Sequence, residues 1–317
     1  MPSSSVRTFD DPDEYALEMR QGTVGLTVKQ RGSFGAKLTR IDLHSLWMQR
    51  LSEDLARTSH VDGLSRARAT IVFRTQPGSS VIRNGVELGL TSMARIGSGQ
   101  GYYTHTSGHV SYGGMSLPLE EMADLGATVA GLDLTPPNDD LTVTPSPGAM
   151  GRLQRLHASA GVLAEDAPAV LAHPEAARGL EQALIEAMVD CLGGGKVEED
   201  RAALRQHAAI MQRFHRVIEK NLDEPLYITE ICKQVGASER TLNVCCQEHL
   251  GMAPKHYLLL RRMHMVRRAL RESTPTETTV TEIATRYGFW QFGRLAGEYR
   301  SLFGELPSAT LARPPHH

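Results

Sequence analysis

The chain has 317 residues, 41% of them hydrophobic, and a formal net charge of −2. Because a domain usually has about 100–200 residues, this length predicts two domains, and the apolar content excludes a chain that is disordered throughout. No stretch approaches the roughly 18 apolar residues of a membrane span, and the N-terminus lacks the apolar segment of a secretory signal. The four cysteines form neither a disulfide framework nor a paired zinc motif, so we expect a cytoplasmic protein without a membrane segment.

Charge is distributed unevenly along the chain. Residues 201–317 contain 17 Lys and Arg against 11 Asp and Glu, a net charge of +6, which leaves 17 against 25 and a net charge of −8 for residues 1–200. A basic module on an acidic body is typical of a protein that binds DNA through one end. An ordinary solvated surface can also carry this excess, so charge alone does not decide between the two.

The first predicted domain, residues 1–145, has the pattern of short strands separated by turns. The segment 67–74 is rich in β-branched and apolar residues, which predicts a strand. Asn84-Gly85 lies between two short apolar runs and predicts a β-hairpin. The segment 43–56 fits either a helix or an irregular insertion. The density of strands and turns predicts a β-barrel or a β-sandwich.

A cluster of turn-forming residues at 136–140 marks the end of this β-rich part. Residues 146–200 then follow a helical pattern, with an apolar stripe that recurs every four residues from Leu180 to Leu192. The stripe fits two roles: packing against the chain's own β domain, or forming the interface of a homodimer. We therefore expect a helical linker or dimerisation region here.

A helix-turn-helix pattern follows within the third predicted region, residues 208–313. Ile231 and Val235 lie on the apolar face of a predicted helix that ends at Gly236, and Ser238 begins the next helix. Glycine adopts the positive φ of a tight turn without strain, and a serine hydroxyl accepts from the free amides of a helix start. Helix, short glycine turn and capped second helix are the features of this DNA-binding motif.

The same pattern occurs a second time. Ile283 and Gly288 stand 52 residues after Ile231 and Gly236, and a second apolar helix follows them. An internal repeat of this kind predicts two similar structural units. The chain therefore carries two predicted helix-turn-helix units.

A predicted helix over 254–272 joins the two units. Its apolar residues recur every three or four positions. A helix of 18 residues is about 27 Å long at 1.5 Å per residue. A rigid connector of that length suits two recognition helices in successive major grooves, which lie about 34 Å apart on one face of DNA.

Several short motifs in this region have a family pattern. They are Ser-x-Arg-x-Leu at 238–242, Gly-x-x-Pro-x-x-Tyr at 251–257, Ile-Ala at 283–284, Gly-Phe at 288–289 and Gly-x-x-Pro at 304–307. Over residues 208–312 the chain resembles the AraC/XylS family of bacterial transcription regulators, and in particular its XylS-like branch.

The resemblance implies an α+β protein with an N-terminal cupin-like β-barrel or sandwich, following helices and a C-terminal all-α domain with two helix-turn-helix motifs. It implies binding to double-stranded promoter DNA, transcriptional activation with RNA polymerase as a partner, and a small-molecule effector, with a homodimer as a further expectation. A DNA-binding regulator controlled by a partner protein is the alternative. A cupin-type enzyme fused to a DNA-binding module is the third reading, but His105 and His109 do not form the His-x-His motif of metal cupins. We therefore expect no catalysis, metal or cofactor.

The first unit departs from the family pattern. Val244 and Cys246 stand where the family usually has an arginine and an aromatic residue. Neighbouring residues must then fill the volume beside Cys246, because an unfilled core position is costly. We expect the second unit to provide at least half of the base recognition.

The outward residues of the two recognition helices are the candidate DNA contacts. They are Ser238, Glu239, Arg240, Asn243, Gln247, Gln291, Phe292, Arg294 and Glu298. Arginine pairs with guanine and Asn or Gln with adenine, while Phe292 either meets a thymine methyl group or is buried. Candidate phosphate contacts are Arg261, Arg262, Arg267, Arg268 and Arg300. Any of these arginines could instead lie on a solvated face or in an ion pair.

Overall fold

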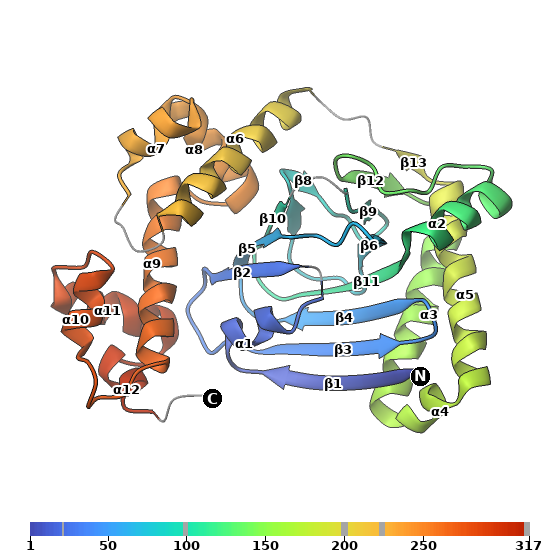
Figure 1. The fold of residues 1–317 in the computed structure, drawn as a ribbon, viewed down its shortest axis with the longest axis horizontal. Coiled ribbons are helices and arrows are strands. Elements are labelled where there is room, and N and C mark those ends of the chain that lie inside the picture. The colour runs from blue at the N-terminus through green and yellow to red at the C-terminus, as the bar shows by residue number, and fades with distance from the viewer. Residues whose placement is uncertain (21, 98–100, 198–201, 222–225, 314–317) are drawn as a thin grey trace.

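The structure, a computed structural model, describes residues 1–20, 22–97, 101–197, 202–221 and 226–313. Two antiparallel sheets form the N-terminal part, and a group of helices from α6 onward lies beside them (Figure 1). The larger sheet has the order β1 (Ser3–Phe9), β3 (Ala36–Asp42), β4 (Trp47–Glu53), β11 (Val110–Pro118), β6 (Arg68–Arg74), β9 (Met93–Arg95), β12 (Leu141–Thr144) and β13 (Lys196–Val197). The smaller sheet has the order β2 (Thr23–Val28), β5 (Arg57–Asp62), β10 (Tyr102–Thr106), β7 (Val81–Arg83) and β8 (Val86–Glu87).

The two sheets pack face to face as an open sandwich, which is one of the two predicted β architectures. Leu38 and Leu51 from the larger sheet share one buried cluster with Leu26 and Val61 from the smaller sheet. Apolar side chains on the two facing surfaces leave water together, and this burial drives the packing of sheets. The N-terminal domain therefore has one core between its sheets.

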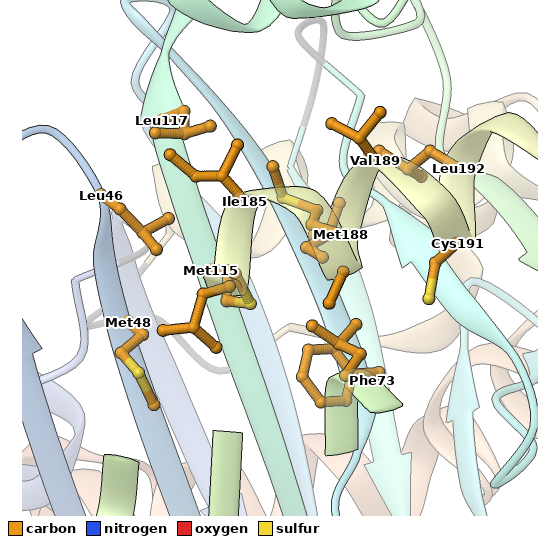
Figure 2. Packing of buried hydrophobic residues seen from close by; sticks show 14 of the residues in the cluster. Leu46, Met48, Phe73, Met115, Leu117, Ile185, Met188, Val189, Cys191 and Leu192 are labelled. Atoms are coloured by element: carbon orange, nitrogen blue, oxygen red, sulfur yellow. The ribbon is translucent and has the colours of Figure 1, made fainter. Parts of the chain in front are cut away.

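A second core lies on the other face of the larger sheet, where helices cover it (Figure 2). These helices are α2 (Leu119–Leu125), η1 (Gly126–Ala130), α3 (Pro147–Asp166), α4 (Pro168–Ala172) and α5 (Pro174–Gly193), while the short α1 (Pro12–Leu17) lies beside β2. Along β6, Ile71 and Phe73 join the helix-covered core, whereas Val72 points into the sandwich. Alternate residues of a strand point to opposite faces, so a sheet covered on both sides needs apolar residues at nearly every position.

The apolar stripe of α5 packs against the chain's own sheet. Leu184, Met188 and Leu192 are buried in the same core as Phe73 and Met115. Figure 2 shows Met188 and Leu192 on the side of the sheet that carries Phe73 and Met115. The first of the two readings from sequence therefore accounts for this face. A homodimer would have to use other surfaces.

The predicted hairpin is present, whereas the segment 43–56 is neither a helix nor an irregular insertion. Asn84 and Gly85 both have positive φ, 46° and 80°, and join β7 to β8. The segment 43–56 contains β4, which pairs with both β3 and β11. Its alternation was hidden because polar Gln49 and Glu53 are themselves fully buried.

The C-terminal domain is entirely helical, as predicted. It contains α6 (Ala202–Lys220), α7 (Ile228–Val235), α8 (Glu239–Leu250), α9 (Pro254–Arg271), α10 (Val280–Arg286), α11 (Phe292–Phe303) and α12 (Pro307–Leu311). Its core gathers residues from all of these helices, and Tyr103 of β10 joins the same core. None of the described helices is long and apolar enough to cross a membrane.

Candidate nucleic-acid interface

Two helix-turn-helix units, α7–α8 and α10–α11, lie at the two ends of α9 (Figure 1). Gly236 and Gly288 have φ values of 70° and 74°, the left-handed conformation that lets each first helix turn sharply into the second. The Ser238 hydroxyl accepts from the Thr241 amide at 3.1 Å and so caps α8. The repeat seen in the sequence is therefore a structural repeat, in which one long helix holds both units.

The first recognition helix, α8, buries one face and presents another to solvent. Leu242, Cys246 and Leu250 lie in the core, as predicted, while Cys245 is fully buried as well. The predicted contacts Ser238, Glu239, Arg240, Asn243 and Gln247 are all exposed. The exposed side chains at the start of α8 suit base contacts, because the N-terminal residues of a recognition helix approach base edges.

The second recognition helix, α11, also buries one face and presents another to solvent. Leu295 and Tyr299 are buried, whereas Arg294 has 70% of its side chain exposed. Arg294 Nε donates to Glu298 Oε1 at 2.8 Å. An exposed pair one helical turn apart contributes only a few tenths of a kcal/mol, so a guanine can replace the carboxylate as partner. Phe292 is exposed rather than buried, which leaves it free to meet a thymine methyl group.

Two exposed aromatic residues near these helices were missed from the sequence. Tyr227 precedes α7 and Trp290 precedes α11 by two positions, and 65% and 77% of each residue is exposed. Both line a groove between the units, together with Arg262 and Arg294. Tyr227 precedes the first helix of one unit, whereas Trp290 lies in the turn between the two helices of the other, so the repeat itself gave no signal for either residue.

The connector α9 carries the predicted phosphate-contact arginines, and most of them have protein partners. Arg261 pairs with Glu219 at 2.8 Å, and the Arg262 guanidinium lies over the Phe289 ring, 5.1 Å from its centroid. Arg300, on α11, is exposed.

Two of those arginines pair with the N-terminal domain, and the burial of one of them, Arg267, corrects the prediction that it contacts a phosphate. Arg267 is buried and pairs with Asp11 at 2.5 Å, and Arg268 pairs with Asp13 at 2.6 Å. Arg271 also pairs with Asp11. The buried Arg267 cannot reach a phosphate in this arrangement, whereas the Arg268 side chain is 56% exposed and stays a candidate. The sequence held no sign that α1 lies there.

The departure at Cys246 is compensated within the core. Cys246 Sγ lies 4.0 Å from the sulfur of Met211, which comes from α6. The long flexible methionine fills the volume that a larger side chain at position 246 would occupy. Burial raises the pKa of the Cys245 thiol to about 11, so this neighbouring thiol is protonated and unreactive near neutral pH.

The recognition helix α8 also contacts the N-terminal domain through its C-terminal end. The Leu250 carbonyl accepts from Thr58 Oγ1 at 2.8 Å and from Lys29 Nζ at 3.4 Å. His105 Nε2 lies 3.3 Å from the Glu248 carbonyl oxygen. Free carbonyls at a helix end attract hydrogen-bond donors and positive charge, so these contacts fix α8 against β5 and β10.

Two cavities in the N-terminal domain differ in size. The cavity inside the sandwich, beside Arg57 and Tyr112, has about 30 Å³ of free space. A second cavity of about 260 Å³ lies between the β7–β8 hairpin, residues 138–142 and α6, and is lined by Arg83, Asn84 and Gln212 among others. Ligand pockets usually have about 300–1,000 Å³, so the second cavity, unlike the first, approaches the size needed for a small molecule.

Comparisons with known proteins agree with this geometry. Residues 231–313 match a family model described as a helix-turn-helix domain. The chain is 36% identical over 136 residues to the probable thc operon regulatory protein of Rhodococcus erythropolis, which covers 40% of this chain and 41% of that protein. It is 37% identical over 102 residues to the XylDLEGF operon transcriptional activator 3 of Pseudomonas putida, which covers 32% and 31%.

Residues 231–313 thus match a helix-turn-helix domain, and the chain is similar in sequence to operon regulators such as the XylDLEGF activator. The chain spans less than half the length of these two curated relatives. Among solved structures, the AraC-like transcriptional activator CuxR matches 77% of this chain and 89% of its own, with 17% identity and a TM-score of 0.43.

Proposed function

We propose that this protein is a sequence-specific transcription regulator that places α8 and α11 in successive major grooves of promoter DNA. The observation that carries the proposal is the attachment of two exposed recognition helices to one connector, α9. Its 18 residues span about 27 Å, a length that suits grooves about 34 Å apart when the helices project beyond its ends. The exposed Arg240 and Arg294 supply one guanine-reading side chain to each groove.

Selection from random duplexes with the full chain tests this proposal. The expected product is a site with two specific elements about one helical turn apart. Inserting five base pairs between the elements turns them to opposite faces of the duplex and should abolish tight binding. Inserting ten should abolish it as well, because a connector of about 27 Å cannot bridge elements about 68 Å apart. A single short element, or no enrichment, would contradict binding through both units.

We further propose that a small molecule regulates the protein from the 260 Å³ cavity. Because α6 lines this cavity and also packs on α7 and α8, a bound molecule would contact both domains at once. Ala208 of α6 lines the cavity, so Ala208→Phe should fill it. A metabolite that raises the melting temperature of the native chain but not of Ala208→Phe would support this site. A metabolite that stabilises both equally would exclude this cavity as its site, whereas a failure of every metabolite to stabilise the native chain would favour control by a partner protein.

The remaining proposals concern assembly and context. We propose activation, contact with RNA polymerase and a cytoplasmic location; the printed names of the two curated relatives, an operon regulatory protein and an operon transcriptional activator, support the proposal of activation. We infer that the protein acts by binding and not by catalysis. The homodimer stays a proposal as well, and light scattering of the purified chain measures it directly.

A further inference from the structure

Three potential ligand side chains meet where the two domains join. His60 and Asp62 lie on β5, and His215 comes from α6 of the C-terminal domain. His60 Nδ1 is 2.9 Å and His215 Nε2 is 2.5 Å from the same carboxylate oxygen, Oδ2 of Asp62. One ligand atom of each residue lies within 4.8 Å of both others. The three side chains thus converge on one point from two domains.

This donor set suits a divalent transition metal. Two imidazole nitrogens and one carboxylate oxygen are ligands that Zn²⁺ takes at about 2.0–2.2 Å, with a water molecule in the fourth position. Ligand atoms around such an ion stand roughly 3.3 Å apart by tetrahedral geometry, so Asp62 Oδ2 has to move away from each of the two imidazole nitrogens by less than about 1 Å. Calcium and magnesium prefer oxygen ligands and fit this set poorly.

The surroundings hold the three residues in place while leaving a route to solvent. The His60 ring is buried, stacked on His215 at 3.4 Å between centroids and contacted by Tyr103 at 4.3 Å. The Asp62 side chain is 46% exposed, so an ion can enter from that side. Neighbours that fix a ligand's orientation reduce the reorganisation that metal binding requires.

A glycine beside the cluster makes room for it. A Cβ atom at Gly101 would stand 2.4 Å from Asp62 Oδ1 and 3.0 Å from His60 Cε1. Any side chain at position 101 would therefore displace the ligands. The space that Gly101 leaves beside these ligands is a separate observation from the contacts among His60, Asp62 and His215.

We propose that His60, Asp62 and His215 form a binding site for a divalent transition metal of the zinc type that bridges the two domains. The ion ties β5 to α6, and α6 packs on both helices of the first helix-turn-helix unit. Metal binding therefore stabilises the docked arrangement of the domains. This inference goes beyond the proposed function, because it requires neither DNA nor an effector.

Zinc titration of the untagged, metal-stripped full chain tests the site. Calorimetry with a competing chelator should show one Zn²⁺ per chain. His215→Ala and Asp62→Asn should each weaken binding at least about 10-fold, since even outer partners of metal ligands commonly contribute 10–100-fold. Both positions are partly exposed, so these variants should fold, which circular dichroism verifies.

His109 and Asp54 provide the matched control. They form a His–carboxylate pair at 3.4 Å on the surface, and neither belongs to the three-residue cluster. His109→Ala should leave the zinc affinity unchanged. Equal weakening in His109→Ala and His215→Ala would overturn the proposal, as would wild-type protein that binds no stoichiometric zinc.

Cobalt and thermal measurements separate a bridging site from adventitious surface binding. Co²⁺ should give the intense visible absorption of four-coordinate cobalt in the wild-type chain and in His109→Ala, but not in His215→Ala. Zinc should raise the melting temperature of the first two proteins only. A spectrum of six-coordinate cobalt, or a melting temperature that zinc raises equally in all three, would contradict the assignment.

Discussion

The two helix-turn-helix units share a fold but differ in how the N-terminal domain reaches them. In the first unit the recognition helix itself is docked, because the Leu250 carbonyl at the end of α8 accepts from Thr58 and Lys29. The N-terminal domain is connected to the second unit through α9, because Arg267 of α9 pairs with Asp11 of that domain. A change in the N-terminal domain therefore acts on α8 directly and on α11 through the connector. The two copies of the motif therefore differ in their distance from the N-terminal domain, and under the proposed function the first unit is the one that an effector would influence directly.

Acidification should weaken the packing of both helix-turn-helix units in the folded chain. We expect this change in the free energy of unfolding to be the largest of the predicted effects. Burial lowers the pKa of His249, at the end of α8, and of His264, on α9, to about 4. Below the ordinary pKa of about 6.5 the unfolded chain binds protons that the folded chain does not, so stability is complete above pH 6.5 and declines toward pH 4. The loss is on the order of 3 kcal/mol for each fully buried imidazole. Chemical denaturation at several pH values measures it.

Substitution of His264 tests whether this residue causes the pH dependence of the free energy of unfolding. His264→Gln should flatten the decline of the free energy of unfolding between pH 6.5 and 4. His256→Gln, at an exposed position on the same helix, should leave the slope as it is. If both variants keep the wild-type slope, His264 is not a source of the acid sensitivity.

Removal of the Asp11 carboxylate should weaken the contact between the N-terminal domain and the connector α9. Asp11→Ala leaves Arg267 without its carboxylate in a buried position, and the loss of one partner from a buried pair costs about 3–5 kcal/mol. The neighbouring pair Asp13–Arg268 is more exposed, so Asp13→Ala should cost less than about 1 kcal/mol. Urea unfolding compares the two. Similar losses of unfolding free energy in Asp11→Ala and Asp13→Ala would contradict the prediction that burial makes the Asp11–Arg267 pair the more important of the two.

Base recognition should depend more on the second unit. On the selected operator, Arg294→Ala should weaken binding by about 1–3 kcal/mol and relax specificity at one base position. Arg240→Ala should cost less, because Val244 and Cys246 depart from the family pattern in the first unit. Gel-shift titrations of both variants on one duplex rank them. A larger loss of binding free energy for Arg240→Ala than for Arg294→Ala would contradict the prediction that the second unit provides at least half of the base recognition.

The smallest effect is expected at the contact between Thr58 and α8. Thr58→Val keeps the shape of the side chain but removes the donor to the Leu250 carbonyl, which costs about 0.5–1.5 kcal/mol. In the proposed arrangement this variant should also reduce the response of DNA binding to an effector. Thr70→Val, on β6 in the other sheet, is the control for loss of a threonine hydroxyl. A response that survives Thr58→Val in full would show that regulation reaches DNA by another route.

The sequence by itself determined the local features of this protein. Gly236 and Gly288, the Ser238 cap and the spacing of apolar residues predicted both helix-turn-helix units, since turns, caps and helix faces depend on residues close together in the chain. The same reasoning predicted the hairpin at Asn84-Gly85. It also separated the buried from the exposed face of each recognition helix correctly for nearly every residue.

Only the tertiary structure decided what distant segments do to one another. Burial of Glu53 concealed the strand β4, since the carboxylate is neutralised by Arg57 and not by any neighbour that an alternating pattern shows. Arg267 is enclosed because α1, some 250 positions earlier, packs against α9. His60, Asp62 and His215 meet for the same reason. Contacts between residues far apart in the chain follow from the packing of whole faces, and no local pattern of residue types encodes them.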